Sequence, residues 1–78
     1  MSKKIPSLSS QKFIFLLKRN GVKFIRQRHT SHAIFERRKK GKIFRAPVIT
    51  AKKELSPKYI KVVLLQLGFT REEINNLF

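Results

Sequence analysis

The stretch VKFIRQRHTSHAIFERRKKGKIFRAP, residues 22–47, decides the fold. Residues that alternate between two faces with a period of two predict one extended segment from Val22 to Gln27 and a second from Ser31 to Arg37. A third extended segment, from Lys42 to Ala46, is expected to end at Pro47, which cannot donate a hydrogen bond to a neighbouring strand. Because the connections between the segments are short, three consecutive antiparallel strands are expected.

The second and third strands are expected to form a hairpin with a basic tip. The run from Arg37 to Gly41 supplies the turn, since Gly41 can adopt a positive φ. Phe13, Phe24 and Phe35 fall on inward-facing positions, so we expect them in the core rather than as platforms for base stacking. The opposite face of the second strand carries His32, Ile34 and Glu36.

Two longer helices are expected to flank the strands. Ser9 is placed to cap the first helix, which ends at Asn20-Gly21. After a connector over residues 48–55, Ser56-Pro57 opens the second helix, and an apolar stripe at i, i+3, i+4 and i+7 runs to Gly68. The stripe consists of Ile60, Val63, Leu64 and Leu67.

A short third helix is expected at the end of the sequence, where Thr70 and Glu73 form a capping box. Two amphipathic helices can cover only one face of a three-stranded sheet. The expected fold is therefore α+β, with a three-stranded antiparallel sheet and both longer helices on one face. Residues 1–7 are expected to be a flexible arm and residues 8–78 a single domain.

The charge of the chain points to an anionic partner. Its 78 residues include 19 Lys and Arg against 4 acids, for a formal net charge of +15. Nucleic acid is the first expected partner, an acidic protein the second and an anionic membrane surface the third. The alternative is that the charge has no specific partner and only keeps the protein in solution. The candidate nucleic-acid-binding residues are Arg26, Arg28, Arg37, Arg38, Lys39, Lys40, Lys42 and Arg45.

The composition excludes several classes of site. There is no Cys, so disulfides, zinc fingers and thiol chemistry are excluded. There is no Asp, and Glu36 is the only acid between Lys18 and Arg45, so the clustered ligands of a two-metal nuclease are missing. We expect no metal and no cofactor. No apolar run reaches 18 residues and no signal-peptide pattern opens the sequence, so we expect a cytoplasmic protein without a membrane segment.

Short motifs follow one another in a fixed order from about residue 8 to residue 75. They are Asn20-Gly21 with residues 22–27, Thr30-Ser31-His32 with Phe35, Ala46-Pro47, and the stretches 53–57 and 65–73. Each motif is weak alone, but the ordered set resembles the HicA toxin family, the YcfA-like mRNA interferases of toxin–antitoxin systems. The sequence departs from the family at His29-Thr30, where the family favours glycine, and by one inserted residue between Arg26 and His32.

The resemblance implies an α-β-β-β-α fold like that of double-stranded-RNA-binding domains. It implies a metal-independent endoribonuclease that acts on single-stranded or structured mRNA, with His32 as the catalytic residue. It also implies an acidic HicB-type antitoxin as the protein partner.

The residue types suit this chemistry. RNA carries its own nucleophile, the 2′-hydroxyl, so the protein need only move protons and stabilise the charged phosphorane. Histidine is suited to proton transfer near neutral pH, and arginine or lysine to stabilising the charge. His29 is expected to be a loop residue without a role, with a second proton donor as the alternative. The competing interpretations are a non-catalytic RNA- or DNA-binding module on the same fold and a membrane-active basic peptide.

Overall fold

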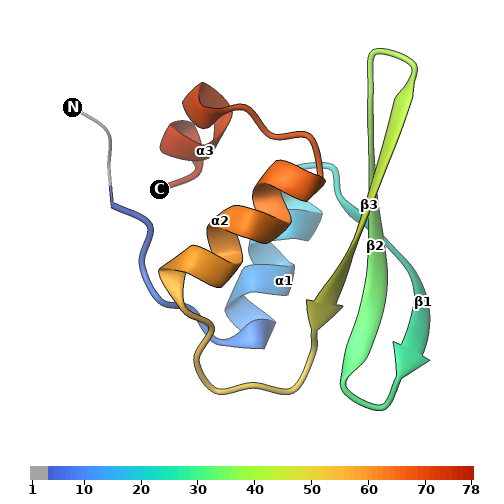
Figure 1. The fold of residues 1–78 in the computed structure, drawn as a ribbon, viewed down its shortest axis with the longest axis vertical. Helices are drawn as coiled ribbons and strands as arrows, with labels where there is room; N and C mark the ends of the chain where they lie inside the picture. The colour runs from blue at the N-terminus through green and yellow to red at the C-terminus, as the bar shows by residue number, and fades with distance from the viewer. Residues whose placement is uncertain (1–3) are drawn as a thin grey trace.

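Six elements make up residues 4–78, the part of the chain that the computed structural model describes. The three strands form one antiparallel sheet in the order β1-β2-β3, and α1 and α2 lie together on one side of it (Figure 1). This confirms the expected α+β fold with α-β-β-β-α order, followed by a short last helix. The elements are α1 (Ser10–Arg19), β1 (Lys23–His29), β2 (His32–Lys39), β3 (Lys42–Ile49), α2 (Pro57–Gln66) and α3 (Arg71–Leu77).

Both longer helices end in the same glycine motif. At the end of α2 the Gly68 N–H donates to the carbonyl of Leu65 and the Phe69 N–H to that of Leu64, each at 3.0 Å. This pair of bonds satisfies carbonyls that the helix leaves unpaired, and it requires a left-handed residue, here Gly68 with φ of +79°. The helix α1 ends in the same way at Gly21, so both expected helix ends are confirmed.

The hairpin between β2 and β3 has a shorter turn than expected. Lys39 pairs with Lys42, so only Lys40 and Gly41 form the turn, with φ of +49° and +80°. Two positive φ values in a two-residue loop are typical of a type I′ turn, whose twist matches that of the flanking strands. The expectation of a turn beginning at Arg37 is wrong, because the chain remains extended as far as Lys39.

The third strand is longer than expected. It runs through Pro47 to Ile49, although the sequence predicts its end at Ala46. Pro47 pairs with Ile34, and an edge strand tolerates proline because the missing N–H can face away from the sheet. The Ile49 N–H donates to the hydroxyl of Tyr59 at 3.0 Å, which ties the end of β3 to α2.

The first strand contains two irregularities in its pairing with β2. Register shifts lie between Phe24 and Arg26 and between Gln27 and His29. Each shift leaves one residue of β1 without a partner, as in a β-bulge. The strand also extends beyond the expected range of 22–27, and His29, expected in a loop, is its last residue.

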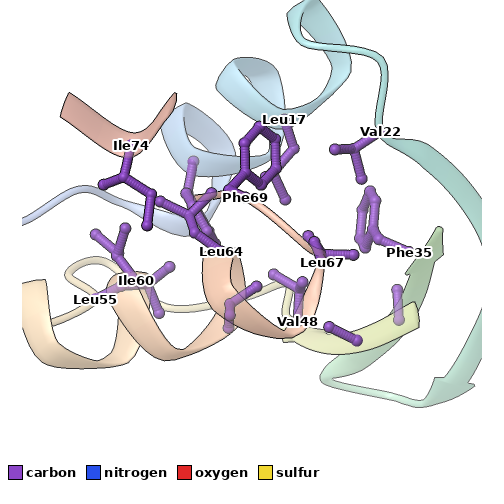
Figure 2. Packing of buried hydrophobic residues seen from close by; sticks show 14 residues of the cluster. Leu17, Val22, Phe35, Val48, Leu55, Ile60, Leu64, Leu67, Phe69 and Ile74 are labelled. Carbon is purple, nitrogen blue, oxygen red and sulfur yellow. The ribbon is translucent and has the colours of Figure 1, made fainter. Parts of the chain in front are cut away.

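The core lies between the sheet and the helices (Figure 2). Phe13 from α1 and Phe35 from β2 are fully buried there, as expected. Phe24 is not in the core: it is 50% exposed, and its ring meets that of Phe35 edge-on with 5.8 Å between the ring centroids. Every residue of β1 is exposed, because this strand lies at the edge of the sheet farthest from the core.

The segment before α1 is held against the rest of the molecule. The expected flexible arm falls partly on residues 1–3, which lie outside the described residues. In the described part, Ile5 packs against the core and Leu8 pairs with Leu55. The hydroxyl of Ser10 accepts a hydrogen bond from the Lys52 N–H at 3.0 Å, which fixes the connector between β3 and α2 against the start of α1.

Candidate nucleic-acid interface

The face of the sheet turned away from the helices is basic and carries two histidines. Ala33 and Phe35 of β2 are buried on the helical side, so the residues between them in sequence point the other way. Residues paired across an antiparallel sheet share a face, which extends the assignment to β1 and β3. We call this surface the open face. It consists of Lys23, Arg26, His29, His32, Ile34, Glu36, Arg38, Ile43, Arg45 and Pro47, together with Ile49, which pairs with His32 at the end of β3 and also packs against the core.

A single acid holds two arginines on the open face. The carboxylate of Glu36, which is only 5% exposed, accepts hydrogen bonds from Nε of Arg45 at 2.8 Å and Nε of Arg38 at 3.1 Å. These bonds, the Arg45 bond first, hold the pKa of Glu36 below its ordinary value of 4.5. Each bond uses only Nε, so the terminal nitrogens of both guanidiniums make no hydrogen bond within residues 4–78. A guanidinium that is held through Nε, with its two terminal nitrogens free to donate, is well oriented to bind a phosphate.

A shallow hollow of about 320 Å³ lies beside these arginines. Two of its lining residues, Ile25 and Arg28, are the unpaired residues of β1, so the bulges turn them toward it. Arginines around an apolar floor suit a nucleotide, because the arginines can meet the phosphate while the floor contacts the base or ribose. The lining consists of Ile25, Arg26, Arg28, Ile34, Arg45, Ala46 and Pro47.

The two histidines face each other at the end of the β1–β2 hairpin. His29 pairs with His32, and their rings meet edge to face with 6.4 Å between centroids. The hydroxyl of Ser31 lies 3.2 Å from Nδ1 of His32, so it orients the ring of this half-buried residue. The Thr50 N–H donates to the Ser31 carbonyl at 2.8 Å, which ties the turn to the end of β3. Nε2 of His32 makes no hydrogen bond within the described residues and is available to a ligand.

The histidine pair lies close to the arginines along the same strand. Ile34, which lines the hollow, is two residues from His32, a separation of about 7 Å along a strand. Glu36 and its two arginines lie four residues from His32, or about 13 Å. A polynucleotide that follows β2 would therefore meet imidazoles and guanidiniums within a few nucleotides.

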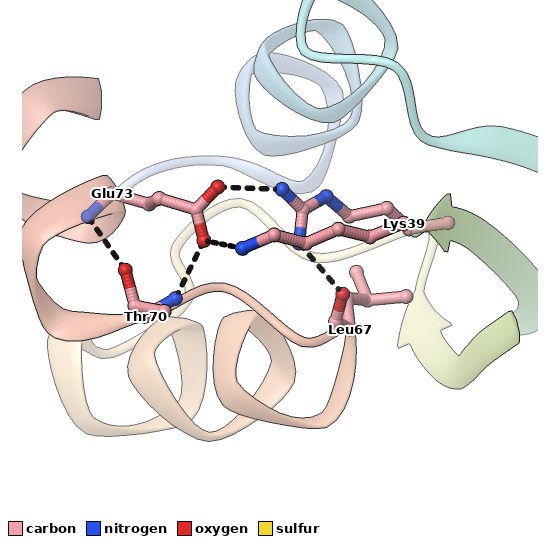
Figure 3. A network of polar contacts seen from close by, with 5 residues as sticks. Lys39, Leu67, Thr70 and Glu73 are labelled. Atoms are coloured by element: carbon pink, nitrogen blue, oxygen red, sulfur yellow. Dashed lines mark hydrogen bonds and ion pairs between the residues drawn. The ribbon is translucent and has the colours of Figure 1, made fainter. Parts of the chain in front are cut away.

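Two of the expected nucleic-acid-binding residues are instead held against the helices (Figure 3). The Arg37 guanidinium donates to the Leu67 carbonyl at 3.3 Å and to the Glu73 carboxylate at 2.8 Å. Its central carbon lies 3.8 Å from the centre of the Phe69 ring. Lys39 donates to the other Glu73 oxygen at 2.8 Å. These contacts join β2 to the junction of α2 and α3.

Alternation explains the different placement of these two cations. Arg37 and Lys39 share the helical face of β2 with Phe35, whereas the expected turn would have exposed every side chain of the basic run. The hydrogen bonds from Lys39, from the Thr70 N–H and from Arg37 lower the pKa of Glu73 to about 2. Glu73 is therefore ionised at neutral pH and occupies both cations. We leave Arg37 and Lys39 out of the candidate interface.

The other expected cations divide between the open face and the hairpin tip. Arg26, Arg38 and Arg45 lie on the open face, and Arg28 lines its hollow. Lys40 lies in the turn. Lys42 pairs with Lys39 and so emerges on the helical side of the tip.

Three residues of this surface were not among the site residues expected from the sequence. The sequence predicts His29 in a loop, although a two-residue turn at Thr30-Ser31 would have paired His29 with His32. It places Glu36 on the face of His32 but does not predict that this carboxylate binds Arg38 and Arg45. Lys23, which pairs with Glu36, completes the open face at its other end.

A larger hollow, of about 690 Å³, lies away from the open face between the N-terminal segment, α2 and α3. Four of its lining residues are cations, and most of the other lining residues are apolar. It is lined by Lys4, Ile5, Pro57, Lys58, Lys61, Arg71, Ile74 and Asn75.

Comparisons of the chain with protein-family models, with curated proteins and with solved structures find no match. Among residues 4–78, no three His or Glu side chains gather in a way that could hold a metal ion. In the same part of the chain, no helix has the length and apolar character needed to cross a membrane. The geometry of the open face is therefore the main basis for a functional proposal.

Proposed function

We propose that the chain is a metal-independent endoribonuclease that cleaves mRNA on its open face, as the toxin component of a toxin–antitoxin system. The observation that carries the proposal is the position of His32, oriented by Ser31 on the same face as an arginine-lined hollow. The order of sequence motifs, which resembles that of the HicA family, supports it independently. Because the substrate is mRNA, we propose that the protein works in the cytoplasm.

In the proposed reaction, the 2′-hydroxyl of a ribose attacks the adjacent phosphorus. When Nδ1–H of His32 donates to the Ser31 hydroxyl, Nε2 carries the lone pair that removes the 2′-hydroxyl proton. The O2′–P bond forms and the P–O5′ bond breaks. A proton delivered to O5′ completes the leaving group, so the products are a 2′,3′-cyclic phosphate and a 5′-hydroxyl.

The arginines supply the charge that this reaction needs. Negative charge builds up on the non-bridging oxygens of the phosphorane, and fixed guanidiniums stabilise it there. Arg26 and Arg45 line the hollow next to the histidines, and Glu36 fixes the orientation of Arg45. DNA lacks the 2′-hydroxyl, so we expect the open face to bind single-stranded DNA without cleaving it.

Replacing His32 tests the proposal. We expect His32→Ala to slow RNA cleavage by roughly 10²–10⁴-fold, the usual contribution of a positioned acid or base. Binding of single-stranded DNA should persist in the variant, because the arginines remain. The measurement is cleavage of a labelled RNA in EDTA by the wild type and the variant. Equal cleavage by the two proteins, or complete inhibition of the wild type by EDTA, would contradict the proposal.

A non-catalytic RNA- or DNA-binding module is the second candidate. The observation that favours it is the Glu36 carboxylate, which orients two arginines for phosphate binding whether or not a bond is cleaved. Phosphate contacts carry no sequence information and do not distinguish RNA from DNA. Tight binding of both nucleic acids, with no RNA cleavage by the wild type, would favour this module over the nuclease.

The proposed toxin requires a restraining partner. We propose an acidic HicB-type antitoxin that covers the open face, because acidic side chains can use the cations that RNA would otherwise contact. Such a partner would block His32 and neutralise part of the +15 charge at the same time.

A further inference from the structure

His29 and His32 form a pair of imidazoles on one surface. The register of β1 and β2 sets them directly opposite each other, and both face away from the core. Their rings are perpendicular, with 6.4 Å between centroids. Transesterification of RNA needs two proton transfers, one from O2′ and one to O5′, and a single imidazole serves both only by moving between them.

We propose that His29 is a second catalytic residue, the general acid that protonates the 5′ oxygen as it leaves. This inference rests on the proposed ribonuclease function. It assigns a residue to the protonation of O5′, the step that the role of His32 as base does not cover. As His32 takes the proton of the 2′-hydroxyl, protonated His29 gives its proton to O5′ and the P–O5′ bond breaks. After the step His32 is protonated and His29 is neutral, and proton exchange with water restores the starting state.

The spacing of the two rings fits one scissile phosphate. Two catalytic hydrogen bonds of about 2.6–3.2 Å each, together with the O2′–P–O5′ unit between them, span at least the 6.4 Å that separates the ring centroids, so both imidazoles are within reach of one phosphodiester linkage. The oxygens O2′ and O5′ lie on opposite sides of the phosphorus during in-line attack. Each can therefore meet a different imidazole while the non-bridging oxygens face the arginines of the hollow.

The different surroundings of the two rings support this division of roles. His32 is half-buried, and its Nδ1 lies 3.2 Å from the Ser31 hydroxyl; in the tautomer whose Nδ1–H donates to that hydroxyl, Nε2 carries the lone pair that a base needs. The ring of His29 is exposed and makes no hydrogen bond within residues 4–78. Water can hydrate its charged form and supply the proton that the acid needs.

A substrate with a sulfur leaving group separates the two roles. In RNA with a 5′-bridging sulfur at the scissile linkage, the leaving group departs as a thiolate, since thiols ionise near pH 8.5 and do not need a proton donor. His29→Gln and His32→Gln keep a polar side chain at each position but remove proton transfer. Both variants would be compared with the wild type on the oxygen and sulfur forms of one oligonucleotide, after circular dichroism establishes that they fold.

We expect His29→Gln to cleave ordinary RNA roughly 10²–10⁴-fold more slowly than the wild type, yet to cleave the sulfur substrate almost as fast. His32→Gln should be slow on both substrates, because the 2′-hydroxyl still needs a base. A purely structural role of His29 would slow both substrates equally, and that result overturns the proposal.

Two other outcomes also overturn it. If His29→Gln matches the wild type on ordinary RNA, His29 has no catalytic role although the ribonuclease proposal stands. If the sulfur substrate rescues His32→Gln instead, the acid is His32. Absence of cleavage by the wild type on either substrate overturns the ribonuclease proposal together with this one.

Discussion

Adjacent arginines on β2 point in opposite directions and have different roles. Arg37 faces the helices, where it contacts Glu73, Leu67 and the ring of Phe69. The Arg38 side chain lies on the open face, is 73% exposed and bonds to Glu36. A basic run in a strand is therefore not one patch, because every second side chain is directed toward the interior.

This difference predicts separate effects of two neighbouring substitutions. Arg38→Ala should weaken binding of single-stranded DNA and reduce the slope of log affinity against log salt by about 0.7, the value for one lost contact to a single strand. Arg37→Met, which keeps an apolar chain against Phe69, should lower the melting temperature and leave that slope unchanged. Fluorescence anisotropy across a salt series, with thermal denaturation of each variant, measures both effects.

The reverse pattern would contradict this assignment. If Arg37→Met lowers the salt slope while Arg38→Ala does not, nucleic acid binds on the helical side of the tip. In that case the open face would not be the interface.

Alternation along β2 was sufficient to predict some residues of the site but not others. It predicts that His32 and Glu36 share a face opposite Phe35, and the register confirms this. It does not predict the pairing of His29, because that depends on the position and length of the β1–β2 turn, and a shift of one residue would turn His29 to the other face. Phe24 is exposed for a similar reason, since no local signal shows that β1 lies beyond the core.

At the scale of the elements, the end of α2 packs closely against β3. A Cβ atom at Gly68 would lie 2.6 Å from Cε2 of Phe44, so this position needs glycine for space as well as for its φ of +79°. Gly21 ends α1 in the same motif with φ of +82°, but a Cβ there would meet no atom within 4 Å. The two glycines therefore differ mainly in the presence of the Phe44 ring.

This pair of glycines gives a controlled stability prediction. Gly21→Ala should cost about 1–2 kcal/mol, the usual penalty for a left-handed L-residue. Gly68→Ala should cost clearly more, because the Phe44 ring must also move, and Phe44→Leu in the same chain should recover part of the difference. Equilibrium denaturation of the four proteins measures these free energies of unfolding. Equal losses of free energy of unfolding in the two alanine variants would show that the Phe44 ring moves aside without an energetic cost.

The helix ends were predictable because their signals are local, whereas the strand ends were not. Ser9, Ser56 and Thr70 cap the three helices as the sequence suggests, each accepting a backbone N–H three residues ahead. The end of β3 depends on pairing with β2 and on the bond from Ile49 to Tyr59, which join residues from different elements. Proline at position 47 is thus a poor strand terminator when its strand lies at the edge.

At the scale of the whole molecule, positive charge is present on two separate surfaces. The open face carries it beside the histidines, and the larger hollow between the N-terminal segment, α2 and α3 carries four more cations. Long-range attraction alone would bring an acidic protein to either surface. Direct competition with nucleic acid distinguishes them, because only one surface contains His32.

We expect the proposed acidic antitoxin and a single-stranded DNA oligonucleotide to exclude each other from the protein. The physical reason is that both use the guanidiniums that Glu36 orients, and two polyanions cannot occupy one set of cations. The measurement is displacement of labelled DNA by the purified antitoxin, repeated at two salt concentrations. Salt should weaken the binding of each polyanion when it is measured separately, since exposed charges are screened beyond about 8 Å at physiological ionic strength.

Matched variants locate the contact between the two proteins. Arg38→Ala and Arg45→Ala should weaken binding of both the antitoxin and DNA, whereas Lys58→Ala and Lys61→Ala at the larger hollow should weaken neither. If a complex of all three molecules forms, and the lysine variants alone weaken antitoxin binding, the partner occupies the helical side. His32 would then remain accessible in the complex, and inhibition of the proposed nuclease would require a conformational change rather than occlusion of the site.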